Sequence, residues 1–181
     1  KVDLLSLSAH KFYGPKGVGA LFVRQQNPTV ELDPLYAGGT QENGLRPGTL
    51  NVPGVVGLGA ACELAQGDLE AERARLTHLR DRLISEVTRA IPTVILNGHP
   101  TDRICHNVSF SSRDLASDLF SLGLGGLAVS TGSACTTGSP NPSHVLKAIG
   151  HSDALARSTL RIGLSRITSE NDLTILIRLI L

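Results

Sequence analysis

Cys135 stands in a run of small, flexible and hydroxylated residues, the segment 130–140. The run contains no large apolar residue that could bury the sulfur. This favours a thiol that moves and reacts. The attacking species would be the thiolate, and an ordinary cysteine has a pKa of about 8.5. A small apolar filler is the other interpretation, and from the residues alone the two weigh equally.

Lys11 is the second residue that could do chemistry. It follows an apolar, strand-like segment and lies beside His10 and close to Ser8. Ligands often bind where strands end, and burial there would lower the pKa of the amine. A neutral amine forms Schiff bases with carbonyl cofactors, and the nearby hydroxyl and imidazole could hold a phosphate. The alternative is an ordinary surface lysine after a strand, which is the more frequent case.

Arg161 is the third candidate, because a charge inside a strand pattern is costly unless it is paired. A substrate carboxylate held by the guanidinium would account for it, and so would an internal aspartate or glutamate. Cys62, on the alanine-rich segment 53–65 that is expected to form a buried helix, and Cys105, at a strand start, are expected to be structural. The chain has no CxxC pair or Cys/His cluster, so no metal site is expected.

The elements that must position these residues alternate between strand and helix. Strands are expected at 2–8, 18–24, 93–96, 107–111, 127–130 and 160–165, and helices at 53–65, 68–91, 114–122, 142–149 and from 169 onward. Segment 68–91 is the clearest helix, with one apolar stripe and Pro92 after its end. The pattern predicts an α/β or α+β fold with a domain boundary near Gly67.

Composition excludes several classes of protein. The 181 residues are 41% hydrophobic and 18% charged, so a packed core is expected. A formal net charge of +1 and 3% aromatic residues argue against a nucleic-acid surface. No apolar run reaches the roughly 18 residues of a membrane span. Three cysteines without paired spacing indicate a reducing compartment, so a cytoplasmic protein is expected, with an organelle matrix as the alternative.

Taken together and in order, several segments resemble the cysteine desulfurases, pyridoxal-phosphate enzymes of the class V aminotransferase superfamily. The matching segments are 8–21, 41–42, 45–49, 51–53, 133–135, 142–146 and 160–162. The resemblance spans essentially the whole chain. It implies part of a fold-type I transferase: the end of the large-domain sheet in residues 1–67, and a smaller α+β C-terminal domain, cut short at its end, in residues 68–181.

The resemblance also implies roles for single residues. Lys11 would hold pyridoxal 5'-phosphate covalently and later move protons on the substrate. Ser8 and His10 would bind the phosphate of the cofactor, and Thr49 would reach the phosphate of a neighbouring subunit, which makes a homodimer the expected unit. Arg161 would clamp the carboxylate of L-cysteine.

Cys135 would then attack the sulfur of the bound cysteine, giving L-alanine and a persulfide. The persulfide would pass to an iron–sulfur scaffold or another acceptor protein, with at most a transient iron–sulfur contact at Cys135. In relatives, the aspartate and histidine that face the cofactor ring lie upstream of the lysine. We therefore expect residues 1–181 alone to bind the cofactor poorly and to be inactive.

Two other interpretations remain at this point. A selenocysteine lyase or related pyridoxal-phosphate enzyme would share most of these residues, although a plain aminotransferase needs no mobile thiol. A non-catalytic interaction or sulfur-carrier fragment would keep the fold without the reaction.

Overall fold

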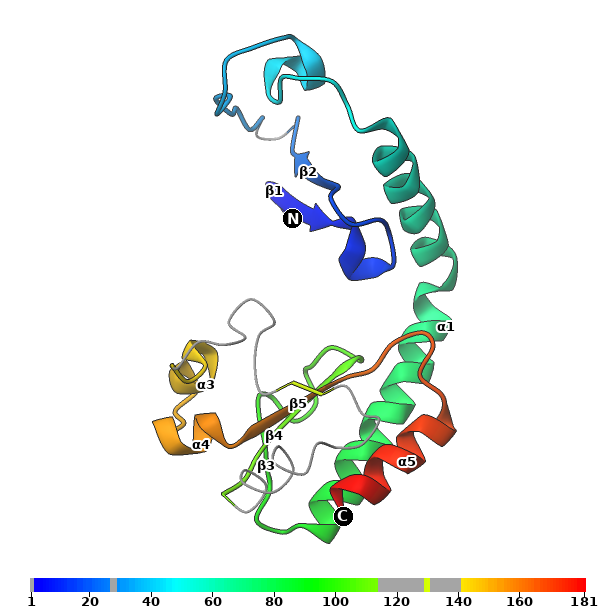
Figure 1. The fold of residues 1–181 in the computed structure, drawn as a ribbon, viewed down its shortest axis with the longest axis vertical. Helices are drawn as coiled ribbons and strands as arrows, with labels where there is room; N and C mark the ends of the chain where they lie inside the picture. Colours follow the sequence, from blue (N-terminus) through cyan, green and yellow to red (C-terminus); the bar gives the residue numbers. More distant parts are fainter. Residues whose placement is uncertain (1, 27–28, 114–128, 131–140) are drawn as a thin grey trace. The chain divides into compact units, whose positions relative to one another are not determined.

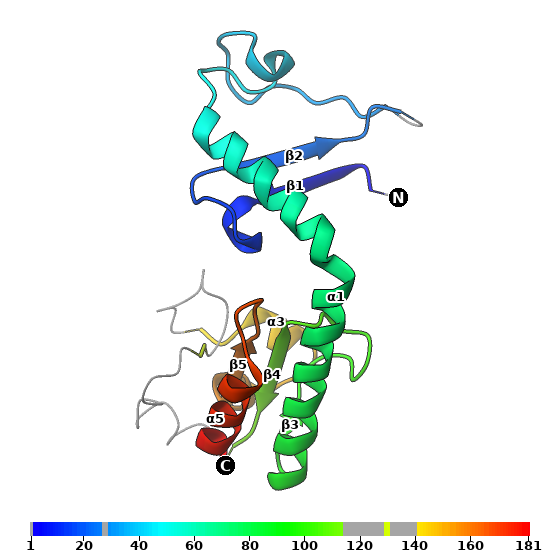
Figure 2. The same ribbon diagram turned by 90° about the vertical axis from the view of Figure 1, so that its right-hand side faces the viewer.

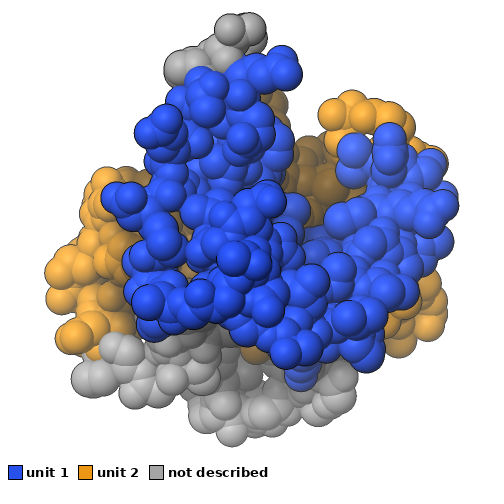
Figure 3. Space-filling model, turned by 90° about the horizontal axis from the view of Figure 1, so that it is seen from above, with its two compact units in different colours: residues 1–69 blue, residues 70–181 orange. Residues whose placement is uncertain are grey.

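The computed structural model describes residues 2–26, 29–113, 129–130 and 141–181 (Figure 1). The chain divides into two compact units, residues 1–69 and 70–181 (Figure 3). The assignment of residues 1–67 to a cofactor-binding domain and 68–181 to a small domain stays a prediction.

Unit 1 contains a two-stranded antiparallel hairpin. Strand β1 (Leu4–Ser8) pairs with β2 (Gly19–Val23) over their full lengths, with Leu4 opposite Val23. Both strands are where the sequence predicted them. Between them lie the short 3-10 helix η1 (Ala9–Phe12) and a turn, and a second 3-10 helix, η2 (Gln41–Gly44), follows later in the loop.

Helix α1 (Val52–Ala90) corrects two expectations. The sequence predicted separate helices before and after Gly67, whereas the structure has one helix, because a single glycine costs only about 1 kcal/mol in a helix. The segment 53–65 was also expected to be buried. Val56 is 66% exposed and Leu64 is 59% exposed, whereas Leu58 and Ala61 are buried, so only one face of this part of the helix is covered.

Unit 2 is built on a three-stranded antiparallel sheet in the order β3-β4-β5. The strands are β3 (Ile95–Leu96), β4 (Asn107–Ser111) and β5 (Thr159–Gly163). The first two lie within the predicted segments, and β5 begins one residue before the predicted 160–165 and ends two residues earlier. Phe110 lies opposite both Leu96 and Leu160, so one face of the sheet is apolar.

That apolar face packs against α1 and the last helix, α5 (Glu170–Ile180), which lie side by side against the sheet (Figure 2). The core includes Leu79, Leu83, Val87, Val108, Phe110, Leu160, Ile162, Leu173 and Ile177, all nearly or fully buried. The predicted stripe of the 68–91 helix is thus confirmed as the core face of α1 from Leu76 to Val87, whereas Leu69, at its start, is 60% exposed.

Two short helices complete the described part of unit 2. Helix α3 (His144–Ala148) lies within the predicted 142–149 segment, and Gly150 follows it with a φ of 99°. Helix α4 (Asp153–Arg157) was not predicted. The predicted helix at 114–122 and residues 127–128 of the predicted 127–130 strand lie outside the described residues. Among the residues that the structure describes, no helix is long and apolar enough to cross a membrane.

Candidate functional site

The turn after β1 carries three of the candidate residues. Ser8 is the last residue of β1, and His10 and Lys11 lie in η1, which follows without a break. The backbone N–H of Ala9 donates to the carbonyl of Val18 (3.1 Å), and its carbonyl accepts from Gly14 (2.9 Å). These bonds fix the path of the chain through the turn, so a hydroxyl, an imidazole and an amine are presented within four residues.

Close packing explains why small residues surround this turn. Ala9 is fully buried, and a Cβ added at Gly14 would lie 2.9 Å from the Cβ of Ala9 and 3.2 Å from that of Ala61 on α1. A Cβ at Gly57 would likewise press on the ring of Pro15 (2.5 Å). The first turns of α1 therefore support the back of the lysine turn through contacts that tolerate no larger side chain.

From the residues alone, Lys11 could be buried at the end of the strand or could be an ordinary surface lysine, the more frequent case, and within unit 1 it lies on the surface. Lys11 and His10 are exposed, and Ser8 is half-buried. Within the 3-10 turn, Ala9 is the residue that is fully buried and Phe12 is half-buried, so the two residues between them are left at the surface. The amine is therefore accessible within unit 1.

The glycine-rich loop that carries Thr49 is folded on itself. The side-chain carbonyl of Gln41 accepts from the backbone N–H of Gly48 (3.0 Å). The guanidinium of Arg46 donates to the carbonyls of Gly48 (2.9 Å) and Thr49 (3.1 Å). Thr49 is exposed, and its hydroxyl forms no hydrogen bond with the described residues. The loop thus presents Thr49 on an ordered backbone.

Arg161 lies in the middle of β5, half-buried and opposite Ser109 of β4. Its backbone also pairs with Ser130, with the N–H of Arg161 donating to the Ser130 carbonyl (2.6 Å) and the N–H of Ser130 donating back (3.1 Å). No acidic side chain among the described residues forms an ion pair with Arg161. The sequence allowed either a substrate carboxylate or an internal aspartate or glutamate as the partner of Arg161. The described residues contain no such internal partner.

A polar network beside Arg161 was missed by the sequence analysis. Asn97, Ser111 and Thr159 are buried and joined by hydrogen bonds. Asn97 Nδ2 donates to Ser111 Oγ (2.8 Å), and the hydroxyls of Ser111 and Thr159 are hydrogen-bonded to each other (2.6 Å). The alternation of polar and apolar residues in both 107–111 and 159–162 was the available signal, since alternate residues of a strand share a face.

Charged groups elsewhere in unit 2 serve its structure. Arg75 donates to Glu72 and to the carbonyl of Thr168 (2.6 Å), which ties α1 to the loop before α5, and the hydrogen bond from Arg75 lowers the pKa of Glu72. Burial lowers the pKa of Arg103, and the nearby Arg80 adds to that effect.

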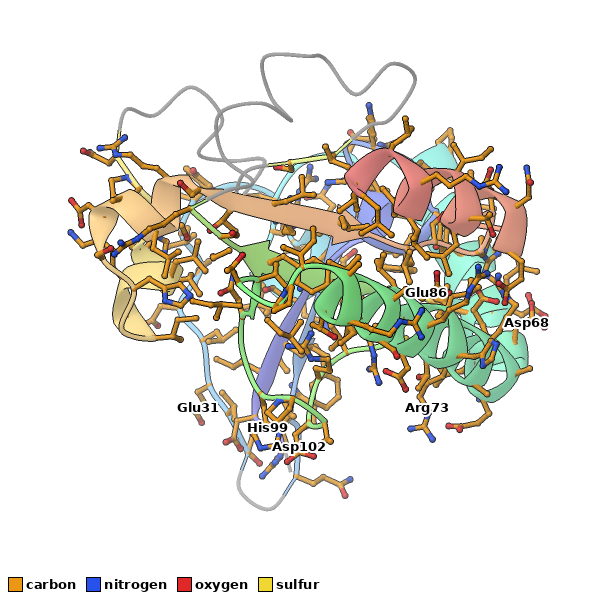
Figure 4. The ribbon with its side chains drawn as sticks, turned by 90° about the horizontal axis from the view of Figure 1, so that it is seen from below. Glu31, Asp68, Arg73, Glu86, His99 and Asp102 are labelled. Carbon is orange, nitrogen blue, oxygen red and sulfur yellow. The ribbon has the colours of Figure 1, made fainter. Side chains whose placement is uncertain are left out.

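The loop after β3 is held locally, as Figure 4 shows for His99 and Asp102, where the Asp102 N–H donates to His99 Nδ1 (2.8 Å).

The three cysteines have different outcomes. Cys135 lies outside the described residues. Cys105 is half-buried against the core, as expected of a structural residue, with its sulfur 4.0 Å from His106 Nδ1. Cys62 was expected to be buried, but it is exposed on α1, because it lies off the face that packs on the turn. The described residues contain no cluster of three or more potential metal ligands.

Comparison with known proteins shows what the chain is similar to. A family model described as aminotransferase class V matches residues 1–176. A cysteine desulfurase of Rattus norvegicus is 47% identical over 174 residues, which cover 95% of this chain and 38% of that protein. The chain therefore spans well under half of the length of this curated relative.

Solved structures give the same result. A "NifS-like protein" superposes with a TM-score of 0.80 and 31% identity, covering 99% of this chain and 46% of that one. A structure titled "SspA in complex with cysteine" superposes with a TM-score of 0.61 and 37% identity, covering 90% of this chain and 44% of that one. The fold is accordingly part of a fold-type I transferase, as predicted from the sequence.

Proposed function

The chain belongs to the class V aminotransferase family, and we propose that it works as part of a pyridoxal-phosphate-dependent cysteine desulfurase. The relatives named above support the reaction, and the titled complex of one of them with cysteine supports the substrate. The observation that carries the proposal is Arg161, a half-buried guanidinium on a sheet face with no acidic partner among the described residues. Such a group suits the carboxylate of an amino acid.

The residues of the lysine turn fit the cofactor that the family implies. The exposed amine of Lys11 suits an aldehyde, and the hydroxyl of Ser8 and the imidazole of His10 suit a phosphate, all on one short ordered turn. When bound, pyridoxal phosphate supplies an electron sink that weakens the carbon–sulfur bond of the substrate. Lys11 binds the cofactor and moves protons at its Nζ, while Arg161 orients the substrate through its carboxylate.

Cys135 supplies the sulfur acceptor in this proposal. Its thiolate attacks the sulfur of the substrate cysteine, so a sulfur–sulfur bond forms as the carbon–sulfur bond breaks. The substrate carbon takes up a proton and leaves as L-alanine, and Cys135 retains a persulfide. One thiol and one cysteine therefore give one persulfide and one alanine, without an external oxidant or reductant.

The partners follow from the same proposal. Thr49, on the self-bonded loop, reaches the cofactor phosphate of a second copy, so the working unit is a homodimer. The persulfide passes to an iron–sulfur scaffold or another sulfur-acceptor protein in the cytoplasm or an organelle matrix.

Two variants of the full-length protein test the assignment. Lys11→Ala is expected to abolish alanine release and the visible absorbance of the bound cofactor. Cys135→Ser is expected to keep that absorbance but to lose the persulfide, measured with a thiol-specific label. Lys16→Ala, which removes an exposed lysine from the same turn, is the matched control and should change neither readout.

Persistence of cofactor absorbance in Lys11→Ala would show that another amine holds the cofactor. Persulfide on the Cys135→Ser protein would show that the acceptor thiol is assigned to the wrong residue.

A further inference from the structure

Four polar residues form one row across the unit 2 sheet. Asn97 pairs with Ser109, whose carbonyl accepts from the Asn97 N–H (2.8 Å). Ser109 is opposite Arg161 in the register of β4 and β5, and Arg161 is opposite Ser130 in the isolated bridge. Residues directly opposite in antiparallel strands project from the same face, with Cβ atoms about 5 Å apart. Ser109 and Ser130 therefore flank Arg161 on its own face of the sheet.

This face is the polar one, opposite the core. The neighbours of the row along the strands, Val108, Phe110, Leu160 and Ile162, are buried in the apolar core on the other side. Ser109, Ser130 and Arg161 are only half-buried, so their side chains remain within reach of a small molecule.

The hydrogen bonds of Asn97 fix the direction of the Ser109 hydroxyl. Asn97 Nδ2 donates to Ser109 Oγ (2.9 Å) and to Ser111 Oγ (2.8 Å). Asn97 Oδ1 accepts from Ser111 Oγ (3.2 Å) and faces His151 Nε2 (2.5 Å). With both ends of a buried amide engaged, Asn97 is held in one orientation. Ser109 Oγ accepts from it and keeps its own proton to donate.

No described residue accepts that proton. Arg161, directly opposite Ser109 in the register, carries only donors on its guanidinium, so adjacent residues offer N–H and O–H donors on one face of the sheet. A carboxylate oxygen is the complementary acceptor, and a hydrogen bond to an ionised group is about twice as strong as one between neutral groups.

We propose that Ser109 is the second donor of the carboxylate site that Arg161 begins, with Asn97 as the residue that positions its hydroxyl. The inference rests on the proposed function and adds two residues to it. Ser109 Oγ donates to one oxygen of the substrate α-carboxylate while Arg161 holds the carboxylate by charge.

The test is a substitution in the full-length, cofactor-loaded protein. Ser109→Ala is expected to raise KM for L-cysteine about tenfold, the low end of the value of a hydrogen bond to a charged group, with kcat little changed. Ser109→Thr keeps the hydroxyl and should restore KM. In an Arg161→Ala background, Ser109→Ala should add less than its single effect, because the carboxylate is no longer held.

Ser111→Ala is the matched control. It removes a hydroxyl from the same strand, face and network, but its partner across the strands is Thr159 rather than Arg161. Because Ser111 is fully buried, the variant should lose at least as much stability as Ser109→Ala. Its KM should rise much less, because the Ser109 hydroxyl and its hydrogen bond from Asn97 remain.

Equal KM effects of the two serine variants, or failure of Ser109→Thr to restore KM, would overturn the inference alone. If Arg161→Ala left KM for L-cysteine unchanged, the carboxylate site itself would be wrong, and the proposed function would lose its main support.

Discussion

Gly14 is one of the residues on which the geometry of the lysine turn depends. A methyl group at this position would lie 2.9 Å from the Cβ of Ala9 and 3.1 Å from its carbonyl oxygen, and 3.2 Å from the Cβ of Ala61. Real Cβ atoms are rarely so close, and Ala9 is fixed by backbone bonds on both sides. The turn or the helix must therefore shift to admit even one methyl group.

Gly14→Ala is accordingly expected to lower the free energy of unfolding by about 1–3 kcal/mol, the range for overpacked sites. The same shift should weaken cofactor binding in the full-length protein, because Lys11 belongs to the same turn. Denaturant unfolding and a cofactor titration measure the two effects.

Gly59→Ala is the control, since a Cβ there meets nothing within 4 Å and alanine favours helices by up to about 1 kcal/mol. A Gly14 variant as stable as the Gly59 variant would contradict the account of the turn.

At this scale the sequence predicted local structure better than the exposure of side chains. The position of Ser8, His10 and Lys11 at the end of a strand and the start of a turn could be predicted because the signals are local, and their roles stay predictions. The exposure of Lys11 and Cys62 could not be predicted, because burial depends on which other segments cover a side chain. The row from Asn97 to Arg161 could not be found either, since it depends on strand register across residues far apart in sequence.

Among the elements, helix α5 shows a start signal that is read directly from the sequence. The Ser169 side chain accepts from the Asp172 N–H (3.1 Å), and the Asp172 carboxylate accepts from the Ser169 N–H (2.9 Å). Such a reciprocal pair can be recognised in the sequence because both partners lie within one turn. The continuity of α1 through Gly67 was not predicted, because packing on either side outweighs the weak local preference.

The capping pair gives a pH-dependent prediction. The backbone N–H and the hydroxyl of Ser169 both donate to Asp172, and these bonds lower the pKa of the carboxyl in the folded state. A lowered folded pKa means that the stabilisation is full above the unfolded value of about 3.9 and is lost as the pH falls through the folded value.

Asp172→Asn keeps an acceptor but cannot titrate, so the wild-type protein should be more stable at pH 7 and the difference should shrink below about pH 4. Denaturant unfolding at several pH values measures this difference in the free energy of unfolding between the two proteins. The carboxylate of Glu72 titrates in the same direction but is present in both proteins, so its contribution cancels in the difference. A stability difference that is the same at pH 3 and pH 7 would contradict this role for Asp172.

For the molecule as a whole, the two units differ in how completely their apolar surface is buried. The core of unit 2 combines α1, β4, β5 and α5 and includes nearly all of the large buried side chains among the described residues. Unit 1 exposes apolar side chains on both strands of its hairpin, with Leu5 46% and Phe22 51% exposed, and on the loop that follows, where Leu35 is 89% exposed. Isolated two-stranded hairpins are marginally stable in water.

This contrast predicts how the 181-residue chain behaves by itself. Backbone amides of β4, β5 and α5 should exchange with solvent much more slowly than those of β1 and β2, because opening of a hairpin without a closed core costs little free energy. The lysine turn follows β1 directly, so the same mobility should leave Lys11 poorly positioned for the cofactor.

Hydrogen exchange by NMR or mass spectrometry measures the exchange rates of the strands, and visible absorbance after addition of pyridoxal phosphate measures cofactor binding. In the full-length protein, exchange in β1 and β2 should become slow and the absorbance should be complete. Slow exchange in the hairpin of the isolated chain, together with a full-strength cofactor band, would show instead that unit 1 needs no further covering.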